Sequence, residues 1–94
     1  MAEVMTRSAD FPRRLVEVLR DGLRKVGIDA EVETERVPDL DLHRVLLTAP
    51  EFHNLWASER QDLVWRIIGQ NFNDDDKMRI SIILTLTPDE LEGK

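Results

Sequence analysis

The sequence predicts a small α+β domain of two layers, in which two helices cover one face of a three-stranded mixed sheet. Three observations lead to this class. Apolar residues recur at helical spacing in two segments and at strand spacing in three others. These segments follow one another in the order α-β-β-α-β. With 94 residues the chain is long enough for one domain but too short for a second layer of helices.

The first predicted element is a helix over about residues 11–26. Residues 1–9 are polar and lack a clear period, so they predict a flexible N-terminus ahead of a single domain over residues 10–94. Asp10 suits an N-cap and Pro12 suits a first turn, while Gly27 suits the position after the last turn. The buried stripe should consist of Leu15, Val18, Leu19, Leu23 and Val26.

Two extended segments come next. Ile28, Ala30 and Val32 alternate with acidic residues, which is typical of a strand with one solvated face near a sheet edge. Residues 35–41 contain Pro38 and predict a loop. Residues 42–48 include a continuous apolar run and predict a more central strand, which ends before Pro50.

A second helix is predicted to begin near Ser58, since Ser58 and Gln61 fit a capping box. Its buried stripe should comprise Leu63, Val64, Ile67, Ile68 and Phe72. Residues 73–77 predict a polar turn. The alternation over residues 78–86 predicts a third strand, parallel to its neighbour because strand-helix-strand crossovers are right-handed.

The composition excludes several classes of function. The absence of cysteine excludes disulfides, thiol catalysis and thiolate metal sites. His43 and His53 are the only histidines, so neither a zinc site nor a catalytic constellation can be assembled, and we expect a non-enzymatic protein. The net charge of -6 argues against broad binding to nucleic acid. The chain has no apolar run approaching the roughly 20 residues of a membrane span and no leader-like start, which predicts a cytoplasmic protein without membrane contact.

Three ordered stretches carry a family resemblance: Val45 to Phe52, Arg60 to Trp65, and Met78 to Glu90 with its Thr-Pro-Asp-Glu ending. Together they resemble the BolA family, whose fold is a KH-like α-β-β-α-β arrangement. The resemblance covers about residues 11–91 and is strongest from His43 onward. It implies a protein that acts with a monothiol glutaredoxin in iron-sulfur homeostasis or a stress response.

The resemblance also implies a shared [2Fe-2S] cluster, but the sequence departs from the family at the ligands. Arg79 stands where the family carries its ligand histidine, and residues 33–41 contain neither cysteine nor histidine. Gln61 and Asp62 replace residues of the family's Arg-His-Arg segment. Because arginine stays protonated and cannot act as an imidazole does, we expect this chain alone to bind no cofactor and no metal.

Two binding surfaces are therefore predicted. The first is a protein-partner surface along the start of the second helix, made of His53, Trp56, Arg60, Trp65 and Arg79. Either tryptophan can instead pack in the core, since aromatic residues serve both purposes. The alternative surface is the basic side of the first helix, which would serve a KH-like, nucleic-acid-associated regulator through Arg13, Arg20 and Arg24. Residues 52–55 lack the Gly-x-x-Gly loop of KH domains, which disfavours this alternative.

Overall fold

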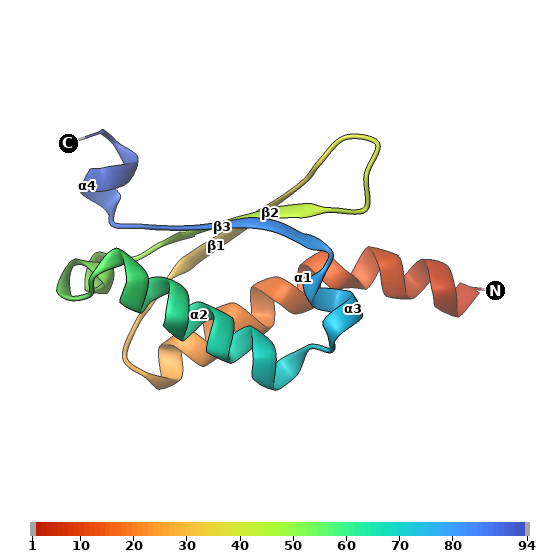
Figure 1. The fold of residues 1–94 in the computed structure, drawn as a ribbon, viewed down its shortest axis with the longest axis horizontal. Coiled ribbons are helices and arrows are strands. Elements are labelled where there is room, and N and C mark those ends of the chain that lie inside the picture. Colours follow the sequence, from red (N-terminus) through yellow and green to blue (C-terminus); the bar gives the residue numbers. More distant parts are fainter. Residues whose placement is uncertain (1, 94) are drawn as a thin grey trace.

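The computed structural model describes the backbone of residues 2–93 and the side chains of residues 10–93. It confirms the predicted α+β class (Figure 1). The elements are, in chain order, α1 (Ala2–Lys25), β1 (Glu31–Arg36), β2 (His43–Thr48), the 3-10 helix η1 (Pro50–Asn54), α2 (Ala57–Asn71), α3 (Asp74–Lys77), β3 (Ile80–Leu86) and α4 (Pro88–Leu91).

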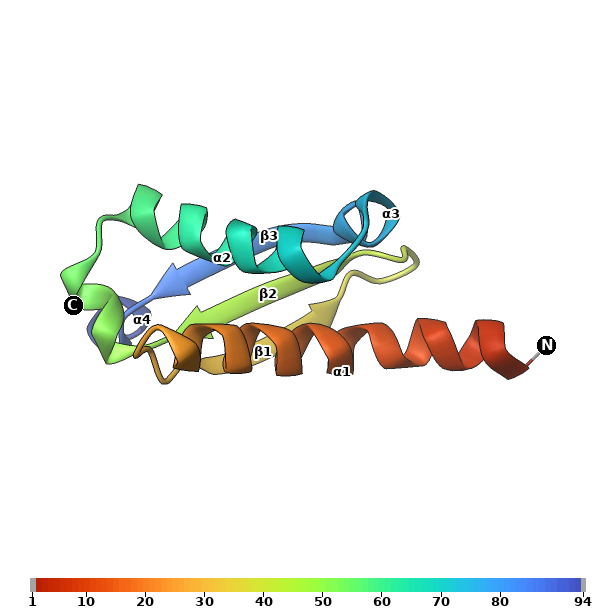
Figure 2. The ribbon, with the colours of Figure 1, turned by 90° about the horizontal axis from the view of Figure 1, so that it is seen from below.

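The sheet has the order β1-β2-β3, with β2 in the centre. β1 pairs with β2 in the antiparallel sense, and β3 pairs with β2 in the parallel sense after the crossover through α2. Figure 2 shows α1 and α2 side by side over the same face of this mixed sheet. The predicted architecture, with both long helices in one layer, is therefore correct.

The core lies between the two helices and the sheet. Its largest fully buried side chains come from four elements: Leu15, Leu19 and Leu23 of α1, Val45 and Leu47 of β2, Phe52 of η1, and Val64 and Ile68 of α2. Gly22 permits the close approach of the helices, since a Cβ atom there would lie 2.7 Å from Ile67 Cγ2. The predicted helix stripes are thus correct, except that Val26 is 56% exposed.

The first helix begins earlier than the sequence predicts. Its backbone is helical from Ala2, so Asp10 lies inside the helix and is not its N-cap. Pro12 is also internal, where it lacks an N–H to donate to the preceding turn. The predicted flexibility of residues 1–9 stays a prediction, and Met1 lies outside the described residues.

The strands deviate from the predicted pattern in several places. β3 begins at Ile80, so Met78 and Arg79 of the predicted strand precede it. β1 begins at Glu31, so residues 28–30 form the approach to the strand and Glu35 belongs to the strand and not to the loop. The pairing of β2 with β3 shifts between His43 and Arg44 of β2, which lie opposite the start of β3. This irregularity turns Ile83 and Thr85 toward the helices, and it leaves Ile82 and Leu84 on the opposite face.

Three helices, α2, α3 and α4, begin with a defined capping motif. The N-cap of α2 is Trp56, not Ser58, and its backbone N–H donates to the Glu59 carboxylate over 2.8 Å. The predicted polar turn forms the single helical turn α3, which Asn73 caps. α4 begins with a capping box, in which Thr87 Oγ1 accepts from the Glu90 N–H and the Glu90 carboxylate accepts from the Thr87 N–H. Within residues 2–93, no helix is both long and apolar enough to cross a bilayer.

Candidate functional site: the corner before the second helix

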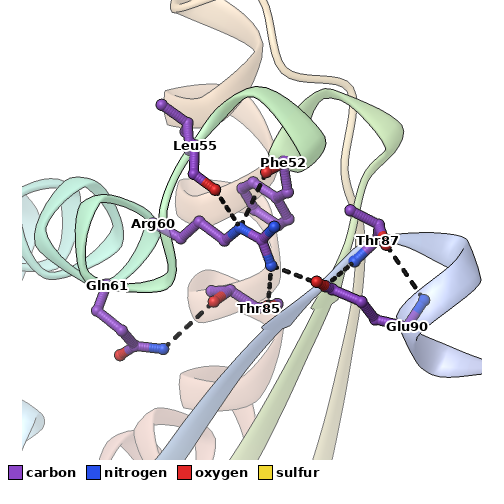
Figure 3. A network of polar contacts seen from close by, with 7 residues as sticks. All are labelled: Phe52, Leu55, Arg60, Gln61, Thr85, Thr87 and Glu90. Carbon is purple, nitrogen blue, oxygen red and sulfur yellow. Dashed lines mark hydrogen bonds and ion pairs between the residues drawn. The ribbon is translucent and has the colours of Figure 1, made fainter. Parts of the chain in front are cut away.

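The candidate site is built on residues 50–60, which run from η1 into the first turn of α2 and which we call the α2 corner. Arg60 is buried beneath this corner, with only 7% of its surface exposed, and stabilises it by hydrogen bonds. Its Nε donates to the carbonyl oxygens of Phe52 at 2.9 Å and Leu55 at 3.1 Å. Its Nη1 donates to the Thr85 carbonyl at 3.0 Å (Figure 3). The corner is therefore fastened to both α2 and β3.

Glu90 supplies the carboxylate for this buried guanidinium. Its Oε1 lies 2.8 Å from Arg60 Nη1 and accepts from the Thr87 N–H at the same distance (Figure 3). The hydrogen bond from Arg60, followed by that from Thr87, lowers the pKa of Glu90 below its ordinary value of 4.5. α4 is thus coupled through one carboxylate to the corner on the far side of β3.

Gln61 extends the same bridge along β3. Its Nε2 donates to the Ile83 carbonyl over 2.9 Å, one pleat repeat away from the Thr85 carbonyl that Arg60 contacts. The side chains of the first turn of α2 therefore occupy two acceptors on the outer edge of β3. This role of Gln61 has no signal in the sequence, since it depends on where the crossover places the helix.

The α2 corner presents Trp56 and His53 to solvent. Trp56 is 80% exposed, the most of any large apolar side chain in the described part of the chain. His53 is also exposed, two residues before the partly buried Leu55. The structure thus supports the placement of both residues on a surface, whereas packing of Trp56 in the core is wrong.

Trp65 and Arg60 are less accessible than a partner-binding surface requires. Trp65 is 39% exposed, and its indole N–H donates to Gln61 Oε1 at 3.2 Å. Arg60 faces inward and contacts acceptors of its own chain. It therefore positions the corner and has no exposed guanidinium to offer a partner.

Arg79 lies in a separate cluster with Phe11, Asp41, His43 and Asp76, which we call the Arg79 cluster. Its Nε is 3.1 Å from Asp41 Oδ2, and its guanidinium stacks over the Phe11 ring at 4.2 Å. Arg79 precedes β3, whereas Arg60 contacts Thr85 near the other end, roughly 20 Å along the strand. The predicted partner surface is thus not continuous.

His43 is the buried member of the Arg79 cluster. It is only 4% exposed. Among the described residues its Nε2 has no hydrogen-bond partner, and it lies 3.7 Å from Asp41 Oδ1. Burial, and then the positive charge of Arg79, lower the pKa of His43 below its ordinary value of 6.5.

The residues present do not fit a [2Fe-2S] cluster held at Arg79. The guanidinium is protonated and ion-paired with Asp41, and the neighbouring imidazole is enclosed by Phe11 and Arg79. Among the described residues, no group of three metal-ligating side chains lies close enough together to hold an ion. That this chain alone binds no cofactor remains a prediction.

The predicted basic surface lies on the exposed side of α1. Arg13, Arg20 and Arg24 fall within an arc of about 40° on an ideal helix, so they form one row. Arg13 and Arg24 reach acidic partners only at 4.0 Å and 3.8 Å, to Asp10 and Asp29. All three arginines are exposed, and two of them are ion-paired at these distances.

Comparisons with known proteins do not assign this chain to a family. The chain matches no protein-family model and no curated protein. The BolA resemblance therefore remains a prediction.

Proposed function

We propose that this chain is a non-enzymatic protein-binding domain whose partner contacts the α2 corner, with Trp56 as the anchor. The observation that carries the proposal is the exposure of the Trp56 side chain, which is 80% exposed although the backbone around it is fixed by hydrogen bonds from the buried Arg60. Buried tryptophans dominate the energetics of many interfaces. An exposed indole has a large apolar surface that a partner can bury.

The backbone around Trp56 is fixed by hydrogen bonds. Arg60 ties the carbonyls of Phe52 and Leu55, and Glu59 accepts from the Trp56 N–H. Little backbone freedom is left to lose when a partner binds, so more of the gain from burying the indole is retained as affinity. His53 flanks the anchor as an exposed polar contact.

The partner class follows from the resemblance. We propose a monothiol glutaredoxin, with a role in iron-sulfur homeostasis or a stress response. Contact would be made through Trp56 and His53. Arg79 would not take part in the same contact, because it lies at the other end of β3 and is ion-paired with Asp41.

The test is calorimetric titration of the purified chain with a purified monothiol glutaredoxin under anaerobic conditions. Trp56→Ala should raise the Kd by about 30-fold, the effect of losing a hot-spot side chain worth about 2 kcal/mol. Trp65→Ala is the matched control and should change the Kd less than about threefold, since Trp65 lies roughly 13 Å farther along α2.

Either of two results would count against the proposal. If the wild-type chain does not bind the glutaredoxin, the partner class is wrong. If Trp65→Ala weakens binding as much as Trp56→Ala does, the anchor is misplaced. Visible absorption of the mixture reports separately whether a cluster is present.

The row of arginines on α1 supports a second candidate, a nucleic-acid-associated regulator. Here the expectation is binding to single- or double-stranded oligonucleotides that weakens steeply with salt. The triple substitution Arg13→Ala, Arg20→Ala and Arg24→Ala should reduce the salt slope by about two to three units. Fluorescence anisotropy at several salt concentrations measures both, and salt-independent or absent binding removes this candidate.

A further inference from the structure

The face of the sheet turned away from α1 and α2 is covered by neither of these helices (Figure 1). Strand register places its side chains in rows that run across the sheet. One row is Glu33, Leu46 and Leu84, and the next is Glu35, Arg44 and Ile82. We call these residues together with Glu31 the open face.

The open face is apolar on the β3 side. Ile82 is 47% exposed and Leu84 is 46% exposed, and the partly buried Leu46 lies beside them on β2. A groove of about 460 Å³ runs over these side chains and is also lined by Glu33, Glu35 and Arg44. The irregularity at the start of β3 is what turns the two aliphatic residues outward.

The open face is acidic on the β1 side. Glu31, Glu33 and Glu35 are exposed and alternate along β1, so they form one row with a spacing of roughly 6.7 Å. Arg44 pairs with Glu35 at 3.1 Å. In the described part of the chain no ion pair involves Glu31 or Glu33, and the face is therefore negatively charged beside an apolar stripe.

We propose that the open face is a docking surface for a basic amphipathic helix of a partner protein. Residues four apart on a helix are about 6 Å apart along its axis, which matches the spacing of alternate residues on β1. Basic side chains at that interval would meet Glu31 and Glu33, while an adjoining apolar stripe would cover Leu46, Ile82 and Leu84.

Dimensions favour a helix over an added strand. β1 and β3 are roughly 10 Å apart across the sheet, about the width of one helix. A helix over β2 therefore reaches the glutamates on one side and Ile82 on the other. A strand added beside β1 would leave Ile82 and Leu84 uncovered, and the outer edge of β3 already bonds to Arg60 and Gln61.

This surface is independent of the Trp56 anchor, which lies at the start of α2 in the helical layer. A partner with two segments can engage both, but neither proposal requires the other. The open face is therefore tested with its own probe and its own variants.

The probe is a synthetic peptide of about 18 residues, or five helical turns, with leucines along one stripe and lysines at every fourth position beside it. We expect calorimetric binding to the full chain and NMR shifts confined to the open face. Glu33→Lys should raise the Kd about tenfold, because it replaces an attraction with a repulsion. Leu84→Ser should raise it about fivefold.

Matched controls separate specific docking from general charge attraction. Glu17→Lys on α1 changes the net charge equally, and Leu40→Ser in the β1–β2 loop removes an aliphatic side chain of similar exposure. Both should leave the Kd within about twofold, since neither lies on the open face. A peptide of the same composition in scrambled order should bind at least tenfold more weakly.

Three outcomes overturn the proposal. The first is absence of binding by the wild-type chain, and the second is equal weakening by Glu33→Lys and Glu17→Lys. The third is self-association of the chain that Glu33→Lys abolishes, which sedimentation would detect and which would assign the open face to the basic α1 of a second copy. Thermal unfolding of every variant verifies that a lost interaction is not a lost fold.

Discussion

Arg60 Nη1 lies 2.8 Å from Glu90 Oε1, which joins the first turn of α2 to α4 across the end of β3. The same guanidinium also donates to three backbone carbonyls, so the α2 corner, the last strand and the last helical turn share one buried cation. This contact ties the rigidity of the Trp56 surface to the stability of the fold.

Arg60→Ala should lower the free energy of unfolding by about 3 kcal/mol, because two buried carbonyl acceptors and a third, partly buried one would lose a charged donor. Arg66→Ala is the control. It removes the same side chain from an exposed position of the same helix and should change stability by less than about 0.5 kcal/mol. Urea unfolding measures both, and equal effects would show that Arg60 is not the structural support described above.

Glu90 makes part of the stability dependent on pH. Its pKa is lowered in the folded state, so its contribution is present above 4.5 and is lost as the pH falls through the folded value. Wild-type protein should therefore exceed Glu90→Gln in unfolding free energy at about pH 7, and the difference should disappear at strongly acidic pH. Urea titrations across this range test it; a difference that is constant with pH would contradict the assignment.

His43 should titrate below 6.5, because burial and Arg79 both disfavour its protonated form. As the folded-state pKa is depressed, stability should decline as the pH falls below 6.5 toward the folded value. Arg79→Met should raise this pKa, since it removes a nearby positive charge and frees Asp41 to favour the protonated ring. NMR titration of the ring protons, assigned with a His53→Gln variant, gives the values. A midpoint above 6.5 in the wild type would refute the buried, neutral state.

Two glycines on facing helices should respond in opposite ways to alanine. At Gly22 a new Cβ would lie 2.7 Å from Ile67 Cγ2, so Gly22→Ala should be destabilising by about 1–3 kcal/mol through overpacking. At Gly69 the nearest atom is the Lys77 Nζ at 3.8 Å, so Gly69→Ala should be stabilising by about 0.5–1 kcal/mol. Thermal melts compare them directly. Ile67→Val should partly restore the Gly22→Ala variant, and no restoration would point to a different cause.

Periodicity predicted the layers, the sheet and the helix stripes because burial repeats at the period of each element. It could not locate the start of α1, since the cue of Asp10 before Pro12 fits an N-cap and is in fact internal. It also could not foresee that the start of β3 reverses the faces of Ile82 and Leu84, because a single irregular pair depends on the partner strand.

The candidate site was predicted less well than the fold. Trp56 and His53 do lie on the surface, whereas Arg60 was chosen for its charge and is buried among carbonyls. Arg79 was placed beside the corner by the resemblance, although it belongs to the far end of the same strand. A charged residue in a sequence gives no sign of whether its counter-ion belongs to another molecule or to its own chain.

The parallel pairing of β2 and β3 has a consequence for how the chain folds. β1 and β2 are joined by a short turn and can meet as a local hairpin, but all of α2 and α3 separates β2 from β3. Closing that long loop is entropically unfavourable until α2 packs on the hairpin. The last strand therefore has no local route into the sheet, and its residues, including those that Arg60 and Gln61 contact, are expected to order late on the folding pathway.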